Sequence, residues 1–159
     1  MRQTKIRGLY KQKIKSMLYK SDNLLNLLIG DCSELSNAEK IKKFNENVKS
    51  HLFIDDTLTE KETLIFFDVV VRSTNSQTKD LRIVLYAICH RDLLDEPQKL
   101  QDYYGNRADV LSELIEETLL NKDNANQFGI GKLKLDTVDI YNSETYYGTE
   151  MIFSATDFR

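Results

Sequence analysis

The amino-acid sequence predicts an α+β fold, in which helices flank a largely antiparallel sheet of four to five strands. Residues 6–18 and 107–120 carry apolar side chains at three- and four-residue intervals, as amphipathic helices do. Residues 64–72 and 81–89 are rich in Ile, Val and Phe, which is typical of strands. Two more strand-like segments close the chain. This order of helix, helix, strand, strand, helix, strand, strand favours α+β.

The chain of 159 residues has the size of one domain, and we expect residues 1–159 to fold as a single unit. Within it we distinguish a basic helical extension, residues 1–30, from a sheet core, residues 51–159, that contains the helix 107–120. Apolar residues make up 41% and charged residues 30%, and the net charge is −3. This composition is that of an ordinary globular protein.

The N-terminal helical segment is either one long helix or two helices joined by a cap, because Ser21 and Asp22 interrupt the apolar series. Gly30 is expected to end it. A short helix should follow, with Ser36 as its N-cap and Glu39 at capping-box spacing. The predicted buried stripe of this helix consists of Ala38, Ile41, Phe44 and Val48.

The segments Leu64–Arg72 and Leu81–Cys89 are predicted to pair as antiparallel strands at the centre of the sheet. The last two strands, about 131–141 and 146–154, are separated by a short turn. The helix Arg107–Leu120 should bury one stripe against the sheet. That stripe consists of Ala108, Leu111, Ile115 and Leu119, widened by Val110 and Leu114.

Cysteine usage and hydropathy bear on the compartment. Cys32 and Cys89 are far apart and lack CxxC spacing, so we expect free thiols and a reducing environment. The longest apolar run is interrupted by Asp68 and is far shorter than a membrane span. No signal-peptide pattern follows the basic N-terminus. We therefore expect neither secretion nor a membrane segment.

Two short motifs resemble nucleotide chemistry without its context. His90-Arg91-Asp92-Leu93 matches the opening of a kinase catalytic loop, but Pro97 stands where a kinase has Asn, and the glycine-rich loop and DFG ligand are missing. Residues 129–132 read Gly-Ile-Gly-Lys, which lacks the spacing of a phosphate-binding loop. We expect no enzymatic activity and no catalytic residue.

A metal site could be drawn from His51, Asp55, Asp56 and Glu60, but adjacent carboxylates in a regular element cannot both face one ion. We therefore predict no metal and no cofactor. The two histidines, His51 and His90, have no nucleophile beside them; the thiol next to His90 points to the opposite face of a strand.

Asp68 interrupts an apolar strand, so it is a candidate buried polar residue. A lone buried carboxylate would cost several kcal/mol. We interpret it as paired, with a neighbour such as Arg82, or as exposed at a subunit interface. A catalytic role would need a second acid or a histidine nearby.

Charge is unevenly distributed and suggests interfaces. The first twenty residues contain seven basic side chains and no acid. They are an interface for an acidic partner or for passing DNA, or else an ordinary solvated face; without an aromatic platform, sequence-specific nucleic-acid binding is not supported. The basic interface candidates are Arg2, Lys5, Arg7, Lys11, Lys13 and Lys15. The acidic ones, on the helix 107–120, are Asp109, Glu113, Glu116 and Glu117.

From about Asp55 to Phe158 the order of parts resembles the tail-terminator and neck (head–tail joining) proteins of long-tailed bacteriophages. The resemblance is carried by the strand around Ile65–Val71, a polar loop, a second strand, a helix opening at Arg107–Val110, and a closing hairpin with Tyr146-Tyr147-Gly148 and Met151-Ile152-Phe153.

This resemblance implies a structural virion protein, made in the host cytoplasm and placed between phage head and tail tube. It implies a homo-oligomeric ring, often six-fold, whose partners are neighbouring neck and tail-tube proteins. Two other readings stay open. One is a small monomeric or dimeric ligand-binding or regulatory module. The other is a hydrolase with Asp68 and His90 in one pocket.

Overall fold

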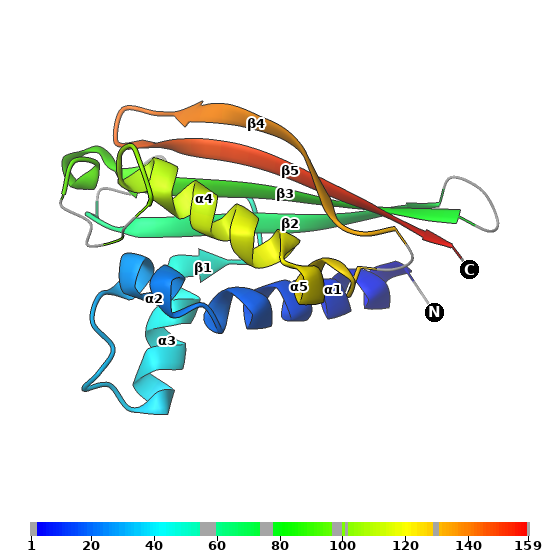
Figure 1. Cartoon of the computed structure of the whole chain (residues 1–159), viewed down its shortest axis with the longest axis horizontal. Helices are drawn as coiled ribbons and strands as arrows, with labels where there is room; N and C mark the ends of the chain where they lie inside the picture. The colour runs from blue at the N-terminus through cyan, green and yellow to red at the C-terminus, as the bar shows by residue number, and fades with distance from the viewer. Residues whose placement is uncertain are drawn as a thin grey trace.

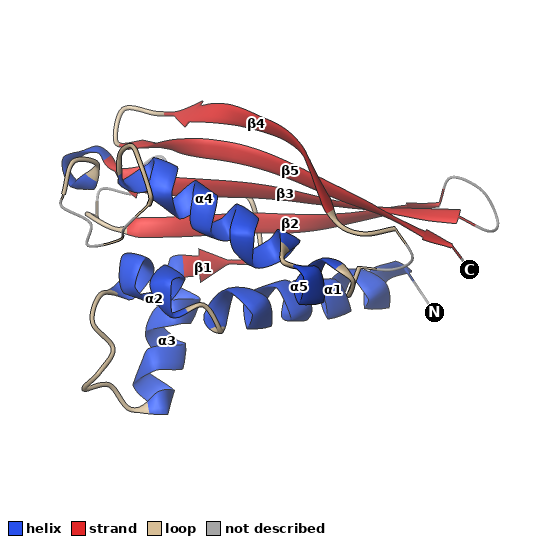
Figure 2. Cartoon of the chain, viewed as in Figure 1, coloured by secondary structure: helices blue, strands red, loops and turns tan. Residues whose placement is uncertain are grey.

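The computed structural model describes residues 3–54, 60–73, 78–96, 100, 102–128 and 131–158. A five-stranded sheet in the order β1-β2-β3-β5-β4 carries its helices on one side (Figures 1 and 2), which confirms the predicted α+β class. The strands are β1 (Val48–Lys49), β2 (Thr63–Ser73), β3 (Thr78–His90), β4 (Lys134–Asn142) and β5 (Tyr146–Phe158). All neighbours are antiparallel except β1, which runs parallel to β2.

The N-terminal segment forms two helices rather than one. The Ser21 hydroxyl accepts a hydrogen bond from the Leu24 amide, 3.4 Å away, and so starts the second helix. Gly30 ends that helix with a positive φ of 83°, which glycine adopts without strain. The helices are α1 (Gln3–Tyr19), α2 (Asp22–Ile29), α3 (Asn37–Asn47), α4 (Arg107–Leu120), α5 (Lys122–Ala125) and the short 3-10 helix η1 (Arg91–Leu93).

The two central apolar segments pair as antiparallel strands, as predicted, with Phe67 opposite Leu85. β3 lies at the centre of the sheet and β2 beside it. The face of the sheet that carries Ile65, Phe67 and Val69 is packed against the helices, and these three side chains are fully buried. α4 begins and ends where the sequence predicts, and all six residues of its predicted stripe are buried.

α1 is part of this core and not a separate extension. Ile14, Met17 and Leu18 are buried in the same cluster as the inward residues of β2, β3 and β5. The sheet also begins earlier than residue 51, because Val48 and Lys49 form β1. A two-residue parallel strand has too short a pattern to be read from sequence.

Four elements meet at one polar junction. The Asn47 side-chain amide donates to the carbonyls of Leu28, at 2.8 Å, and Thr63, at 3.1 Å. The Arg107 guanidinium donates to the Thr63 hydroxyl, at 2.8 Å, and to the Leu27 carbonyl, at 2.5 Å. The ends of α2 and α3 are thereby tied to the starts of β2 and α4.

α3 differs from its prediction. Ser36 caps it as expected, accepting from the Glu39 amide at 3.2 Å. Phe44 and Val48 are buried, but Ala38 is exposed and Ile41 is 47% exposed. The reason is that α3 is anchored at its C-terminal end and projects away from the sheet (Figure 1), so its N-terminal half has nothing to pack against.

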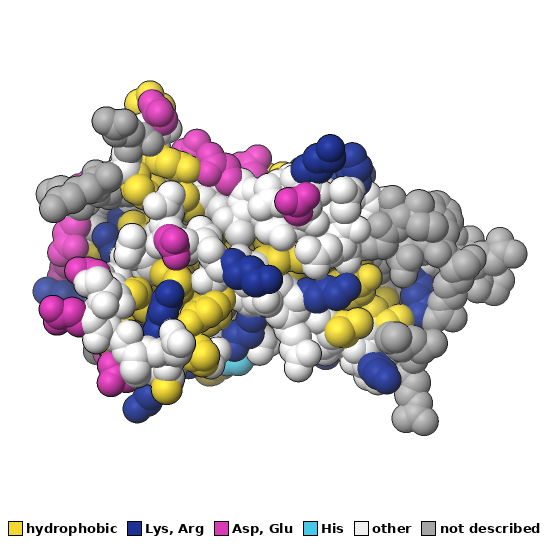
Figure 3. Space-filling model, turned by 60° about the horizontal axis from the view of Figure 1, so that its bottom comes forward, with side chains coloured by type: hydrophobic (Ala, Val, Ile, Leu, Met, Phe, Trp, Pro, Cys, Tyr) yellow, Lys and Arg dark blue, Asp and Glu magenta, His cyan; other side chains and the backbone are white. Residues whose placement is uncertain are grey.

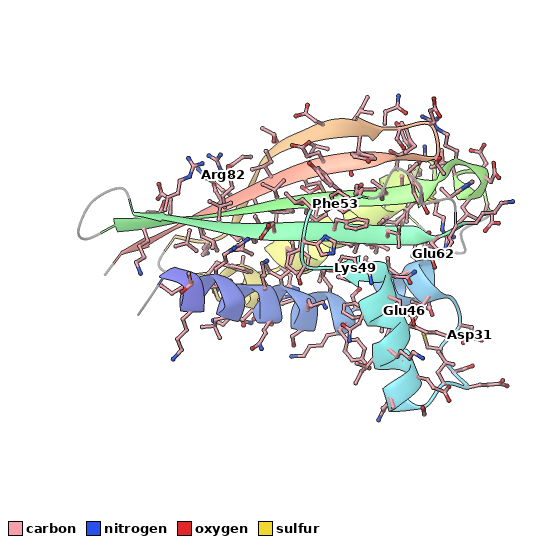
Figure 4. The ribbon with its side chains drawn as sticks, turned by 180° about the vertical axis from the view of Figure 1, so that it is seen from behind. Asp31, Glu46, Lys49, Phe53, Glu62 and Arg82 are labelled. Carbon is pink, nitrogen blue, oxygen red and sulfur yellow. The ribbon has the colours of Figure 1, made fainter. Side chains whose placement is uncertain are left out.

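The second face of the sheet has no helical cover among the described residues (Figure 4). Leu64, Phe66, Ile88 and Tyr146 form a small separate cluster there, against which Ile54 packs. Much of the remaining face, including Val84 and Ile152, is half-buried.

Val69→Asp is expected to unfold the protein or make it insoluble. Val69 is 0% exposed, and an unpaired carboxylate there would cost several kcal/mol. The matched control is Val138→Asp on the same face, where the side chain is 52% exposed; its free energy of unfolding should change by about 0.5 kcal/mol or less. Chemical denaturation followed by circular dichroism measures both. A folded, soluble Val69→Asp protein would contradict the packing described.

Candidate assembly surfaces

The basic helix α1 is fastened to the sheet through Asp68. The Asp68 carboxylate lies 2.7 Å from the Arg7 guanidinium and 2.9 Å from the Lys11 ammonium, and it also accepts from the Val69 amide at 2.8 Å. The predicted pairing with Arg82 is therefore wrong. Sequence analysis favoured Arg82 because it lies on the neighbouring predicted strand. The actual partners, Arg7 and Lys11, lie about sixty positions away in the chain.

The pKa of Asp68 reflects this contact. Partial burial opposes its ionisation, but the hydrogen bonds from Lys11, Arg7 and the Val69 amide outweigh burial and hold the pKa below its ordinary value. The carboxylate is thus ionised at neutral pH and forms ion pairs with two of the cations of α1.

α1 also closes one edge of the sheet. β1 pairs only with Ile65 and Phe66 of β2. Beyond them, the Arg7 guanidinium donates to the edge carbonyl of Val69 at 2.8 Å, and Lys11 donates to the carbonyl of Ser50 at 2.8 Å. A strand of another chain cannot pair with β2 at this position while α1 lies along it (Figure 1).

The remaining basic candidates differ in availability. Lys15 donates to the Asn45 side chain on α3 at 3.0 Å, and burial together with the charge of Lys49 lowers its pKa. Lys13 lies 5.2 Å over the Tyr10 ring. Lys5 is exposed. Arg2 lies outside the described residues.

The acidic candidates lie on α4. Asp109 completes a capping box with Asn106, each side chain accepting from the other's backbone amide. Glu117 accepts a hydrogen bond of 2.6 Å from the Tyr103 hydroxyl, which raises the pKa of Tyr103 to about 12. Glu116 is exposed and Glu113 half-buried, so these two remain available to a partner.

Beside α4, the edge strand β4 exposes two large apolar residues. Val138 is 52% and Ile140 71% exposed. Ile140 is paired with Thr149, whose hydroxyl contacts Ser112 of α4. Because Glu116 is one turn beyond Ser112, it projects toward the same side of the helix. We call this surface, formed by α4 and β4, the acidic flank. It consists of Val138 and Ile140 with Glu113 and Glu116; Asp139 is paired with Glu150 and points to the other face of the sheet.

The projecting end of α3 is a second exposed surface, which we call the α3 arm. Ile41 is one turn before Asn45, the residue bonded to Lys15, so Ile41 faces the corner between α3 and α1. Lys42 and Lys43 beside it are exposed, and Lys40 lies 5.4 Å over the Tyr19 ring. The arm consists of Ala38, Glu39, Lys40, Ile41, Lys42 and Lys43, so lysines outnumber its single acid.

The hydrolase reading is not supported by the geometry. Asp68 pairs with Val84, and His90 lies six residues farther along β3, so about 20 Å separates them. The His90 ring accepts from the Asp92 amide at 3.1 Å and meets Tyr146 edge-on. Cys89 and Cys32 are free thiols, as predicted.

The structure does not support the candidate metal site of His51, Asp55, Asp56 and Glu60 either. Asp55 and Asp56 lie outside the described residues, and among those described no three His, Cys, Asp or Glu side chains are grouped to hold an ion. Gly131 of the Gly-Ile-Gly-Lys motif instead approaches the backbone of β5, donating to the Thr156 carbonyl at 2.8 Å. A Cβ there would lie 2.7 Å from that oxygen, which explains the glycine.

A hollow of about 480 Å³ opens near β1 and the start of β2 (Figure 4). Burial and the neighbouring Glu60 raise the pKa of Glu62 within it. Its lining combines charged and aromatic side chains: Glu46, Lys49, His51, Phe53, Glu60, Glu62, Leu64 and Phe66. Sequence analysis grouped only His51 and Glu60 of these residues, as part of a candidate metal set; it did not predict that the stretches 46–53 and 60–66 together line a hollow.

We compared the sequence with models of known protein families. Residues 11–155 match the YomW family, a span that runs from within α1 to β5. The chain belongs to the YomW family. This family is phage-related, of the SPbeta-like prophage type. None of the curated proteins compared with the sequence matches it.

The match covers α1 from Lys11 onward, the α3 arm and the acidic flank, whereas Arg7 lies before it. The arm and the flank are therefore parts of the family's domain and not additions at its ends. Among the described residues of this YomW-family chain, no helix combines the length and apolar character needed to cross a membrane.

Asp68→Asn should destabilise the domain by about 1 kcal/mol at pH 7, since its cationic partners are partly exposed. A carboxyl whose folded-state pKa is lowered stabilises the fold above its unfolded pKa, and this stabilisation is lost as the pH falls through the folded pKa. The difference from wild type should therefore be complete at pH 7 and shrink below about pH 4. Urea unfolding at several pH values measures it.

The matched control is Asp92→Asn. Asp92 pairs with Lys61 at 3.3 Å, but both side chains are more than half exposed. Its removal should change stability by less than Asp68→Asn does. Equal effects of the two substitutions, or an Asp68 effect that grows toward low pH, would contradict the role assigned to the α1 contact.

Proposed function

We propose that this YomW-family protein is a structural subunit of a phage particle, a ring-forming tail-terminator or neck subunit that joins head and tail tube. The phage-related family supports the setting. The resemblance in the order of strands, helix and closing hairpin supports the place within the particle. Its partners would be further copies of itself and the adjoining neck and tail-tube proteins.

The observation that carries the proposal is the presence of two unlike exposed surfaces on one compact domain. The acidic flank exposes Val138 and Ile140 beside carboxylates, and the α3 arm exposes Ile41 beside three lysines and Glu39, so the net charges of the two surfaces are of opposite sign. Figure 3 shows basic side chains across the face where α1 lies and acidic ones toward its upper and left margins. Unlike surfaces join head to tail, and a head-to-tail contact closes into a ring when its rotation permits.

The proposal revises the role of α1. Its apolar residues and two of its cations stabilise the chain's own sheet, so the helix supports the assembly surface and is not itself a detachable arm. Exposed cations such as Lys5 remain on the outside, where they are available to a partner protein or to DNA nearby. The work of such a subunit is geometric, and we propose that it involves no catalysis and no cofactor.

The hollow near β1 favours a second candidate, a small ligand-binding module. Its charged rim and the Leu64–Phe66 floor would suit a small amphipathic molecule. The two candidates differ in the size of the protein in solution, because a module of this kind acts as a monomer or dimer.

The proposed function predicts that the purified full-length chain forms a closed oligomer larger than a dimer. Its mass by light scattering should rise with concentration and reach a plateau, as a closed ring requires. In the phage, particles made without the protein should contain heads and tails that are not joined. Electron microscopy of such particles, and of wild-type particles labelled with an antibody to the chain, measures both outcomes.

A monomer at all concentrations, together with normally joined particles in the absence of the protein, would contradict this proposal. Label on the head shell or the tail tip would contradict the neck location while leaving a structural role.

A further inference from the structure

We infer that the α3 arm of one copy docks in the acidic flank of the next copy, so that Ile41 packs on Val138 and Ile140. This inference rests on the proposed function, since it specifies the contact from which the assembly is built. The other exposed large apolar residues in the described part of the chain are Leu9, Phe53 and Tyr104.

The apolar residues of the two surfaces are complementary in kind. The apolar stripe of α3 is buried at Phe44 but 47% exposed at Ile41. This is the pattern expected of a helix whose outer half is covered by another molecule. The strand β4 beside α4 offers an exposed apolar surface, with Ile140 71% exposed. Docking of a helix through its apolar face is a common mode of protein recognition.

Charge decides which surfaces can meet. A two-fold contact through the arms would place Lys42 and Lys43 against the same lysines of the partner. A two-fold contact through the flanks would place Glu116 against acidic side chains. The unlike combination sets Lys42 and Lys43 beside Glu113 and Glu116, so the charges favour docking of arm on flank.

Sheet extension does not offer an alternative route to a ring. Among the described residues the edge strands are β1, of two residues, and β4, of nine; Arg7 of α1 binds the edge carbonyl of Val69 on β2, so β4 is the edge long enough for strand pairing. Pairing of β4 with β4 of a second copy is two-fold and stops at a dimer. A contact that repeats from copy to copy must therefore use two different surfaces.

The arm and the flank cannot meet within one chain. α3 projects from the side of the molecule opposite to β4, with the sheet between them (Figure 1). A link between Ile41 and Ile140 would therefore join two copies. This property makes the contact testable by disulfide formation.

The variant that tests the contact carries Ile41→Cys and Ile140→Cys. The half-exposed native thiol is removed by Cys32→Ser. Mild oxidation should give a ladder of disulfide-linked species on a non-reducing gel, ending at the size of the closed oligomer. Chains with only one of the two new cysteines should give no ladder. The matched control replaces Ile41→Cys with Tyr104→Cys, since Tyr104 is 79% exposed but lies outside the arm, and it should not cross-link.

Charge exchange provides a second, independent test. Lys42→Glu with Lys43→Glu, or Glu113→Lys with Glu116→Lys, should each raise the concentration for half-assembly at least about tenfold. The chain that carries all four substitutions should recover most of that loss, because every contact again pairs unlike charges. Lys42, Lys43 and Glu116 are exposed and Glu113 is half-buried, so the variants should fold, which circular dichroism verifies.

The outcomes separate the inference from the proposed function. An assembled wild-type protein that gives no ladder and is insensitive to the charge exchange would overturn the arm–flank contact and leave the structural role intact. A disulfide dimer from Ile41→Cys alone would overturn it in favour of a two-fold contact. A wild-type chain that never assembles would overturn both.

Discussion

The contact of Asp68 with Arg7 and Lys11 determines which surfaces of this domain are free. A carboxylate in the middle of an apolar strand is acceptable only with a cation beside it, and both cations come from α1. Once they are in place, α1 lies along β2 and its guanidinium also satisfies an edge carbonyl. One edge of the sheet is thereby closed, and β4 at the other side is left open.

A second polar junction sets the direction of α3. Asn47 and Arg107 bind carbonyls and a hydroxyl from α2 and β2, so the C-terminal end of α3 is held firmly. The N-terminal half then extends beyond the sheet and carries Ile41 away from the core. The exposure of this side chain follows from how the helix is anchored, and it accounts for a stripe that is amphipathic in sequence but only half buried in the fold.

These constraints produce a domain whose distinctive features are on its outside. The residues that suggest chemistry in the sequence are occupied by structural tasks: His90 accepts from a turn amide, and Gly131 permits a close approach to β5. What remains is a rigid sheet with apolar and charged surfaces of opposite sign, within a phage-related family. An assembly subunit needs such surfaces, since rigidity and unlike contacts are what set the geometry of a ring.

The sequence by itself determined the elements and most of the core. Helix Arg107–Leu120, the antiparallel pairing of the two central strands and the cap at Ser36 were readable, because periodicity and capping are local properties of the chain. The sequence left open whether the N-terminal segment is one helix or two, and the structure shows that Ser21 caps a second helix. The tertiary structure decided what local patterns do not contain. The partners of Asp68 lie about sixty residues away, the strand β1 is two residues long, and the exposure of Ile41 and Ile140 depends on which elements fail to cover them. Charge pairing and burial join residues that are distant in the chain, and so the surfaces proposed here for assembly became visible only in the folded domain.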